Sequence, residues 1–243
     1  MDESLYHEFY EVERSHWWFQ ARREILYTLA LQFLAPKSKL LDIGCGTGYF
    51  LEKAQEAFQV WGVDASPIAV GMCQKRGLIG VSQGSPENLS AVQGNTFDAV
   101  TFFDVIEHLD DDLGALLRAK DLLSSKGLCL ITVPAYQWMW SKHDDLNHHK
   151  RRYTKPQLAR VILNAGFGIK KISYFNSYLF PLAAAVRTIK KILNMQEGNE
   201  FAIPSPFVNN SLKSIFQSEL SVLKTSSLTF PFGLSIIAIA EKK

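Results

Sequence analysis

The sequence predicts an α/β fold, in which a doubly wound, mostly parallel sheet of seven strands carries helices on both faces. Short apolar runs alternate with amphipathic segments along the chain, which is the pattern of βαβ units. Most of these runs are continuously apolar, as expected of strands buried on both faces. The strands are expected at Lys39–Ile43, Val60–Val63, Leu78–Val81, Ala99–Phe102, Leu128–Val133, Ile169–Tyr174 and Ser235–Ala240.

Length and composition agree with one such domain. The chain has 243 residues, of which 47% are hydrophobic and 21% charged, as in ordinary globular proteins. Its net charge of +2 gives no reason to expect a nucleic-acid partner. Three cysteines, Cys45, Cys73 and Cys129, are too few and too widely spaced for a disulfide scaffold or a metal-binding pair. With no apolar leader and no apolar run of membrane-spanning length, we expect a cytoplasmic protein without a transmembrane segment.

The helices divide the single domain, 1–243, into four parts. We expect an N-terminal helical cap over 1–36, the core of the sheet over 37–175, a helical insertion or lid over 176–233 and the last strand within 234–243. Within the core, one helix is expected at Tyr49–Phe58. Another is expected to begin at Asp110–Asp112 and to end at Ser125-Lys126-Gly127, because a cation and a glycine favour a helix C-terminus.

The insertion contains an amphipathic helix with one basic face. Apolar residues recur there at spacings of three and four, with cations on the other side. A helix that covers the sheet explains this pattern most simply; a substrate lid or a peripheral membrane contact are the alternatives. The apolar residues are Leu179, Leu182, Val186, Ile189 and Leu193, and the polar face holds Arg187, Lys190, Lys191 and Asn194.

A glycine-rich turn and two carboxylates predict a nucleotide-like ligand. The segment Gly44–Gly48 ends a strand and opens into a helix, so its backbone and the first helical amides can approach a ligand closely. Asp64 closes the next strand, where a carboxylate can accept hydrogen bonds from two ribose hydroxyls. Asp42 precedes the turn and suits an ammonium group better than a pyrophosphate. Since Leu51 also replaces the third glycine of the dinucleotide pattern, a nicotinamide-dependent oxidoreductase is disfavoured.

Four ordered blocks between Leu40 and Phe175 carry a family resemblance: LLDIGCGTG, VWGVDASPIAV, FDAVTFFDVIEHLDD and LLSSKGLCLITVP. In these blocks the chain resembles the class I S-adenosylmethionine-dependent methyltransferases, in particular the bacterial small-molecule branch of the methyltransferase type 11 kind. The resemblance implies a Rossmann-like fold with 37–175 as the cofactor-binding core, S-adenosyl-L-methionine as cofactor and S-adenosyl-L-homocysteine as product. Two flanking segments, HWWFQARREIL and WSKHDDLNHHKRRYTKPQLARVILNAGF, resemble methyltransferases of polysaccharide and natural-product pathways.

The resemblance also implies a cofactor site. Asp42 and the turn glycines would lie at the methionine part, Asp64 at the ribose, and the strand-end carbonyls at the methionine ammonium. The block around Ser85 departs from the family, because an acidic residue commonly stands there and Pro86 offers no N–H to the adenine. The implied cofactor residues are Gly44, Gly46, Gly48, Asp64, Ala65, Ser66, Ser85, Phe102 and Phe103, with Arg22 or Arg23 on the cofactor carboxylate; a Trp-rich helix with solvated arginines is the alternative for the last two.

The acceptor is expected at the carboxyl ends of the fourth and fifth strands, where open α/β sheets bind ligands. Of the histidines there, we favour His108 and His149 as general base, because an imidazole pKa of about 6.5 suits a base near neutral pH. The expected substrate-binding residues are Asp104, Tyr136, Trp138 and His143.

Two further interpretations remain open for this region. Asp104, Glu107 and His108 would share one face if their segment is helical, and His148 or His149 could complete a metal site, as in some quinone-type O-methyltransferases. The basic run His148–Tyr153 would hold a phosphate or carboxylate of the acceptor, or else be a solvated loop.

The sequence thus predicts methyl transfer to an oxygen or nitrogen nucleophile of a small-molecule or lipid-linked acceptor. The alternative is a non-catalytic relative that binds a partner or a membrane surface through the insertion. No pattern in the sequence predicts the oligomeric state.

Overall fold

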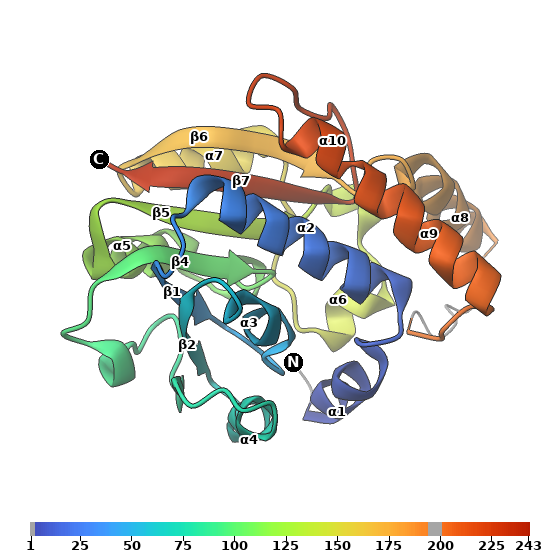
Figure 1. The fold of residues 1–243 in the computed structure, drawn as a ribbon. Helices are drawn as coiled ribbons and strands as arrows, with labels where there is room; N and C mark the ends of the chain where they lie inside the picture. Colours follow the sequence, from blue (N-terminus) through green and yellow to red (C-terminus); the bar gives the residue numbers. More distant parts are fainter. Residues whose placement is uncertain (1–2, 194–200) are drawn as a thin grey trace.

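The computed structural model describes residues 3–193 and 201–243, which build one seven-stranded sheet flanked by helices (Figure 1). The strand order is β3-β2-β1-β4-β5-β7-β6; β7 is antiparallel to both of its neighbours, and the other pairs are parallel. The predicted fold class is therefore confirmed. The strands are β1 (Lys39–Ile43), β2 (Gln59–Asp64), β3 (Val81–Gln83), β4 (Phe97–Phe103), β5 (Leu123–Pro134), β6 (Phe167–Phe175) and β7 (Ser235–Lys242).

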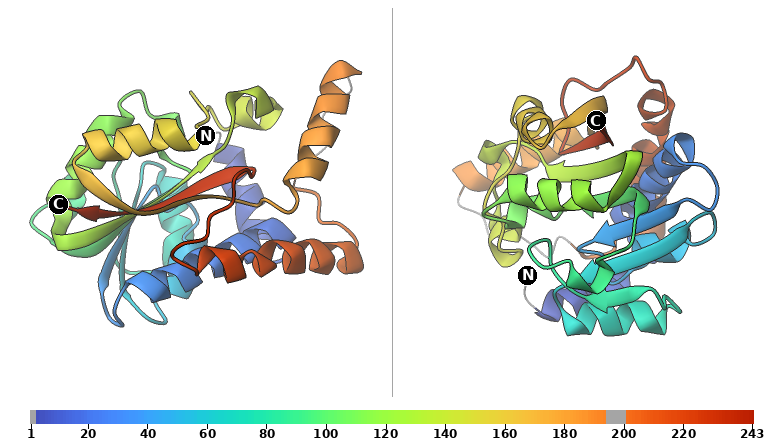
Figure 2. Two further views of the ribbon diagram at one scale, coloured as in Figure 1. Left: turned by 90° about the horizontal axis from the view of Figure 1, so that it is seen from above. Right: turned by 90° about the vertical axis from the view of Figure 1, so that its left-hand side faces the viewer.

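Helices lie on both faces of this sheet (Figure 2). On one face, α2 packs against α3 and α9, and on the other α7 packs against β6 and α5. The helices of the first half are α1 (Glu3–Val12), α2 (Trp17–Phe33), α3 (Tyr49–Ala54), α4 (Pro67–Lys75) and α5 (Asp112–Leu122). Those of the second half are α6 (Lys142–Leu146), α7 (Lys155–Asn164), α8 (Phe180–Ile192), α9 (Pro206–Ser218) and α10 (Leu220–Leu223).

The position of β1 creates the crevice in which a ligand can bind. β1 pairs with β2 on one side and with β4 on the other, so the chain leaves its carboxyl end in one direction and returns on the opposite side. Leu40, Leu41 and Ile43 of β1 are fully buried, as its continuously apolar sequence predicts. In open α/β sheets this point of reversal, at the carboxyl ends of the strands, is where ligands bind.

The helix α5 ends earlier than its sequence predicts. It stops at Leu122, and the expected terminator Ser125-Lys126-Gly127 lies inside β5. Leu123 is buried and pairs with Phe97 of β4, so burial of this side chain draws the segment into the sheet. The extra residues are absorbed at the β4–β5 irregularity, where Lys126 has a positive φ of 63°.

Two other boundaries differ from the predictions. The third strand begins at Val81 and not at Leu78, because Leu78 is buried beside the glycine turn and not in the sheet. The helix after the turn ends at Ala54, and the apolar continuation to Phe58 reflects burial of Phe58 against Tyr27, with ring centroids 6.4 Å apart.

The two longer helices of the segment before β7, α8 and α9, pack differently. α9 lies on α2: the Asn209 side chain accepts a hydrogen bond from the Trp17 backbone N–H at 2.9 Å and donates to the carbonyl of Ser15 at 2.9 Å. α8 has no buried residue among those described, and Asn194 lies outside the described residues. None of the helices in the described ranges is long and apolar enough to cross a membrane.

Candidate functional site

One cavity of about 720 Å³ opens at the carboxyl ends of β1 and β4. Its walls come from the glycine turn, from α1 and α2, from the segment after β4 and from α6 and α8. The cavity therefore joins the expected cofactor residues at one end to the expected acceptor residues at the other.

The glycine turn leaves room for a ligand. Gly46 has a φ of +55° and faces the cavity, and no atom of the described part of the chain lies within 4 Å of the position that a Cβ would occupy. Gly48, at φ +79°, is closed on its other side by Leu78 and Cys73, which a Cβ would meet at 2.6 and 2.8 Å. The backbone of this turn can therefore approach a bound molecule at Gly46 while it packs tightly behind it.

Asp64 presents its carboxylate beside this turn. It accepts hydrogen bonds from the backbone N–H groups of Gly46, at 2.8 Å, and Ser66, at 2.9 Å. Burial raises its pKa, and these two bonds oppose the rise. The Tyr6 hydroxyl of α1 also donates to it, at 3.3 Å. Ala65 lines the cavity, whereas Ser66 caps α4 and lies outside the lining.

Asp42 lies at the floor of the cavity as the last polar side chain before the turn. The Thr101 hydroxyl donates to its carboxyl group at 2.5 Å. Burial raises the pKa of Asp42 to about 7, although the Thr101 bond and the charge of Arg22 oppose the shift. A cationic ligand group at this position would stabilise the charged carboxylate.

Arg22 of α2 reaches into the same region. It forms an ion pair with Asp104 at 2.7 Å and donates to the Thr132 hydroxyl at 2.7 Å, while its guanidinium lies 5.2 Å from the Trp18 ring centroid. Arg23 instead stacks over the Tyr49 ring at 4.0 Å. Both arginines line the cavity, so neither is merely solvated.

Of the remaining expected cofactor residues, Ser85 and Phe103 line the cavity and Phe102 does not. Ser85 lines the cavity with Gly84 and Pro86, on the side expected for the adenine. The Phe103 side chain lines it too and packs edge-on against Phe50, with ring centroids 4.8 Å apart. The side chain of Phe102 is fully buried outside the lining.

Of the four residues expected to bind the acceptor, two line the cavity and two do not. Asp104 and His143 line the cavity. Tyr136 and Trp138 lie outside the lining; Tyr136 stacks on Tyr174, with ring centroids 5.1 Å apart, and Trp138 meets Phe180 of α8 edge-on at 6.2 Å.

A cluster of ionisable side chains closes the acceptor end. His108 and His149 meet edge-to-face, with ring centroids 4.6 Å apart. Each offers a nitrogen within 4.8 Å of the other and of a carboxylate oxygen of Glu107. Burial and the charge of His149 lower the pKa of His108 to about 4, so this imidazole is neutral at physiological pH. Glu107 is fully buried, and within residues 3–193 and 201–243 neither of its carboxylate oxygens has a hydrogen-bond partner; burial and the charge of Asp104 raise its pKa.

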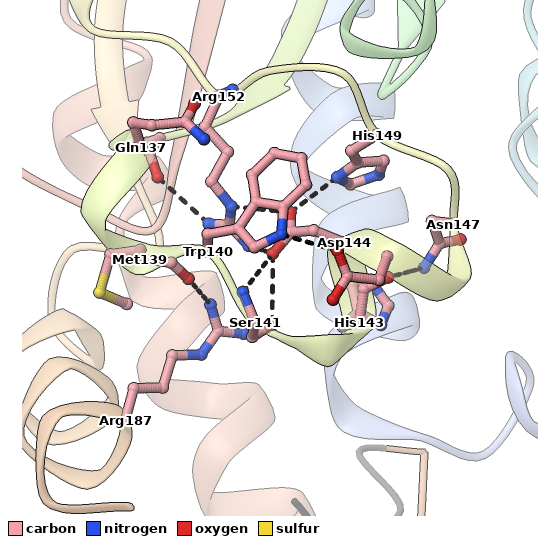
Figure 3. A network of polar contacts seen from close by, with 12 residues as sticks. Gln137, Met139, Trp140, Ser141, His143, Asp144, Asn147, His149, Arg152 and Arg187 are labelled. Carbon is pink, nitrogen blue, oxygen red and sulfur yellow. Dashed lines mark hydrogen bonds and ion pairs between the residues drawn. The ribbon is translucent and has the colours of Figure 1, made fainter. Parts of the chain in front are cut away.

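Asp144 fixes the orientation of His149 (Figure 3). Its carboxylate lies 2.7 Å from Nδ1 of His149 and accepts two hydrogen bonds from Arg152, from Nε at 2.7 Å and from Nη2 at 2.8 Å. Burial opposes ionisation of Asp144, but the bonds from His149 and Arg152 and the charge of Arg152 hold its pKa well below the usual range. Since an ionised carboxylate only accepts, Nδ1 of His149 must donate to it, so that in the neutral imidazole the lone pair lies on Nε2.

This arrangement corrects the predicted metal face. Asp104 has a positive φ of 59° and residues 106–108 form a single 3-10 turn, so Asp104, Glu107 and His108 do not share the face of an α-helix. Asp104 is held by Arg22, and the three donors that converge are those of Glu107, His108 and His149. One carboxylate and two imidazoles suit a divalent transition metal, and Asp144 would orient the His149 ligand.

The basic run before α7 is held by carboxylates of the chain itself. Lys150 forms an ion pair with Asp110, and Arg151 forms one with Asp112 at 3.3 Å. Arg152 is buried on Asp144. These three cations hold the acceptor loop against the start of α5 and against α6, so the run is not simply a solvated loop.

Other residues at the site carry no signal in the sequence. Tyr6, Glu13 and Arg76 come from α1, from the link to α2 and from the end of α4. Arg76 forms an ion pair with Glu13, and the Thr47 hydroxyl of the glycine turn donates to Glu13 at 2.7 Å. No local spacing relates these positions, because the fold brings them together across 34 to 63 residues.

A family model described as a methyltransferase domain matches residues 16–176. The ubiquinone biosynthesis O-methyltransferase of Xanthomonas axonopodis pv. citri (strain 306) is 26% identical over 155 residues, an alignment that covers 56% of this chain and 65% of the relative. The curated relatives of this name are therefore matched over less than two thirds of their own length.

Solved structures show the same fold at low identity. An S-adenosylmethionine-dependent methyltransferase of Thermotoga maritima, described as a possible histamine N-methyltransferase, has a TM-score of 0.60 at 19% identity and covers 98% of this chain and 99% of its own. The N-methyltransferase NodS of Bradyrhizobium japonicum WM9, solved with S-adenosyl-L-homocysteine, has a TM-score of 0.54 at 15% identity and covers 92% and 87%. From the family match and the shared fold, the chain belongs to the methyltransferase-domain family, among the class I S-adenosylmethionine-dependent methyltransferases.

Proposed function

We propose that this chain transfers the methyl group of S-adenosyl-L-methionine to an oxygen or nitrogen nucleophile of an amphipathic small molecule. The observation that carries the proposal is that one cavity joins the Gly46–Asp64 end, suited to the cofactor, to the His108–His149 end, suited to an acceptor. A methyl transfer needs both reactants in line and water excluded, and a shared cavity with a partly aromatic wall supports this arrangement.

The residues of the cofactor end fit the cofactor. Asp64 already accepts one hydroxyl donor, that of Tyr6, at the place where a ribose hydroxyl is proposed to bind. Asp42 suits the methionine ammonium, and Arg22 suits the carboxylate. The bound cofactor would supply an electrophilic methyl group on a sulfonium; the protein aligns the acceptor with it.

His149 is the proposed general base. With Nδ1 held by Asp144, its Nε2 lone pair is available for the proton of the acceptor. The same geometry serves a hydroxyl or an amine. The ubiquinone relatives, which are named for O-methylation, favour oxygen as the acceptor atom.

The cavity walls favour an acceptor with an apolar part, and hence a lipid-linked one. Trp17, Trp18, Phe19 and Phe103 line the cavity, and Lys190 lies at its α8 side. Aromatic walls stabilise an apolar body, while a cation at the rim stabilises an anionic or polar head.

Isothermal titration with S-adenosyl-L-homocysteine tests the first requirement of the proposal, which is that the chain binds the cofactor. The intact protein should bind, and Asp64→Ala or Gly46→Arg should weaken binding at least tenfold, because the first loses the ribose acceptor and the second fills the open side of the turn. Asp121→Asn, an exposed position outside the cavity, is the matched control. Absence of binding by the folded, unmodified protein would refute the proposed function and leave a non-catalytic binding protein.

Methyl transfer itself is measured with radiolabelled cofactor and a panel of phenolic and amine acceptors with and without a prenyl tail. Transfer to tailed acceptors, lost in His149→Gln, supports the full proposal. Cofactor binding without transfer to any acceptor of the panel would count against the proposed acceptor class.

A further inference from the structure

The helix α8 is packed unlike the other long helices of the described chain. It has thirteen residues and buries none of them. Three of its large apolar side chains are mostly exposed: Leu182 at 62%, Ile189 at 53% and Ile192 at 76%. In Figure 2 the helix stands clear of the sheet, beyond the carboxyl ends of the parallel strands.

The two sides of α8 differ in what they meet. Ala183, Arg187 and Lys190 line the cavity, and Arg187 also donates to the carbonyl of Met139 at 2.9 Å. The exposed apolar residues Leu182, Ile189 and Ile192 recur at the spacing of one helical face and are absent from the cavity lining. One side of α8 thus belongs to the site, and the other presents aliphatic side chains to the surroundings.

The charge of α8 indicates the kind of surface to which this helix can bind. Between Phe180 and Leu193 there are three cations, Arg187, Lys190 and Lys191, and no acidic residue, although the whole chain has a net charge of only +2. A helix with an exposed aliphatic face flanked by cations matches the boundary between anionic headgroups and acyl chains. The first turn of α9 lies at the same end of the molecule as α8 (Figures 1 and 2). Phe207 in this turn is 82% exposed.

We propose that α8 docks on an anionic lipid bilayer, with its aliphatic face in the headgroup layer and its other side forming the mouth of the cavity. Val186 both lines the cavity and is exposed, so the mouth opens along the docked helix. This inference rests on the proposed function in one respect: a mouth at the bilayer surface gives the site access to an amphipathic acceptor that resides in the membrane.

Vesicle sedimentation tests the docking with no need for activity. The full chain, saturated with S-adenosyl-L-homocysteine, is spun with vesicles of phosphatidylcholine alone or with 30% phosphatidylglycerol, at about 0.1 M salt. We expect binding to the anionic vesicles only, weakened at 0.5 M salt. Ile189→Ser with Ile192→Ser should lower the partition coefficient at least tenfold, and Lys191→Glu about fivefold or more.

Matched controls replace residues of the same kind elsewhere on the surface. Ile79→Ser and Lys75→Glu alter exposed positions that do not line the cavity, and these variants should bind vesicles like the unmodified chain. All variants should keep the same melting temperature, because the replaced side chains are exposed.

The proposal is overturned if the unmodified chain stays in the supernatant with anionic vesicles, or if the α8 variants bind like the controls. It is also overturned if sedimentation velocity shows a dimer that Ile189→Ser with Ile192→Ser dissociates, since a second copy would then cover this face. The proposed function fails separately, by absence of S-adenosyl-L-homocysteine binding in titration, and neither result decides the other.

Discussion

Asp144 holds both a histidine and an arginine in the buried part of the acceptor loop. Its carboxylate meets His149 Nδ1 and the Arg152 guanidinium, and the backbone N–H of Ser141 donates to it at 2.8 Å. Sequence inspection selects the histidine, because imidazole chemistry is recognisable from residue type. It does not select the aspartate, which is one of two adjacent in the chain and becomes special only through burial.

Replacement of Asp144 should therefore affect catalysis through His149. In Asp144→Asn the His149 tautomer is no longer fixed, and we expect kcat to fall about 100-fold with KM changed less than threefold, since base catalysis contributes about 10²–10⁴-fold. Initial rates across pH 6–9 measure this effect. Asp145→Asn, next along the chain, is the control. His149→Gln keeps the Asp144–Arg152 ion pair and should show the same loss of kcat. If Asp144→Asn and His149→Gln both kept the kcat of the unmodified chain, the role of His149 would be contradicted.

The carboxylate of Glu107 and the imidazoles of His108 and His149 could bind a metal ion in place of serving base catalysis. A divalent cation held by these three donors would occupy the His149 Nε2 lone pair that the proposed base requires. We therefore expect protein purified without chelator to contain less than about 0.1 metal ion per chain and to keep full activity in EDTA. One equivalent of metal, lost in Glu107→Gln but retained in Asp104→Asn, would assign the cluster to metal binding in place of base catalysis.

At the scale of elements, α1 covers the cofactor end of the cavity. Its Tyr6 hydroxyl donates to the Asp64 carboxylate that is proposed to accept the ribose hydroxyls. The link from α1 to α2 is anchored on the glycine turn through Glu13, Thr47 and Arg76. The N-terminal cap thus contacts the proposed cofactor site at two places, at Asp64 and at the glycine turn.

If Tyr6 competes with the ribose for Asp64, its hydroxyl must leave when the cofactor binds. We expect Tyr6→Phe to tighten S-adenosyl-L-homocysteine binding about two- to tenfold in titration, the range of one net hydrogen bond. Tyr10→Phe on the same helix, over the Arg76 guanidinium, is the control and should leave affinity unchanged. Weaker binding by Tyr6→Phe would instead make Tyr6 a direct contact of the cofactor.

The sequence predicts the elements of the sheet better than their ends, and residues 97–128 show why. Burial on both faces makes the central parts of β4 and β5, Ala99–Phe103 and Leu128–Val133, mostly apolar, a pattern that needs no tertiary information. The end of α5 depends on a competition between a local terminator and the pairing of Leu123 with Phe97, which is non-local. The positive φ of Asp104 has the same origin, since the ion pair with Arg22 joins residues 82 positions apart.

For the molecule as a whole, the cavity is a product of distant segments. The glycine turn, Asp64 and the histidines could be predicted from the sequence, because each is a local motif at a strand end. The pairing of α2 with α9 could not be predicted, because the hydrogen bond from the Trp17 N–H to Asn209 joins residues that are 192 positions apart. The α9 part of the insertion is thereby fixed on α2 of the N-terminal cap.

The same burial leaves carboxyl groups that make stability depend on pH. Glu219, at the end of α9, is fully buried and accepts hydrogen bonds from the backbone N–H groups of Ser177, at 2.5 Å, and Tyr178, at 2.8 Å. Burial nevertheless raises its pKa to about 7 from the ordinary 4.5. Between these values the folded state binds a proton that the unfolded state has lost. The Glu219 contribution to the free energy of unfolding therefore falls as pH rises from about 4.5 to 7.

Glu219→Gln removes this titration and keeps an oxygen acceptor for the two backbone donors. We expect the free energy of unfolding of the unmodified chain, minus that of the variant, to fall with pH at a slope approaching about 1.4 kcal/mol per unit between pH 5 and 7. Urea denaturation at half-unit pH intervals measures it, and taking the difference cancels the other titrating groups. Glu56→Gln, which removes a carboxylate from an exposed ion pair with Lys53, is the control. A flat difference for Glu219→Gln would mean that water reaches this carboxylate, and that the junction between α9 and the strand end of β6 is more open than its contacts show.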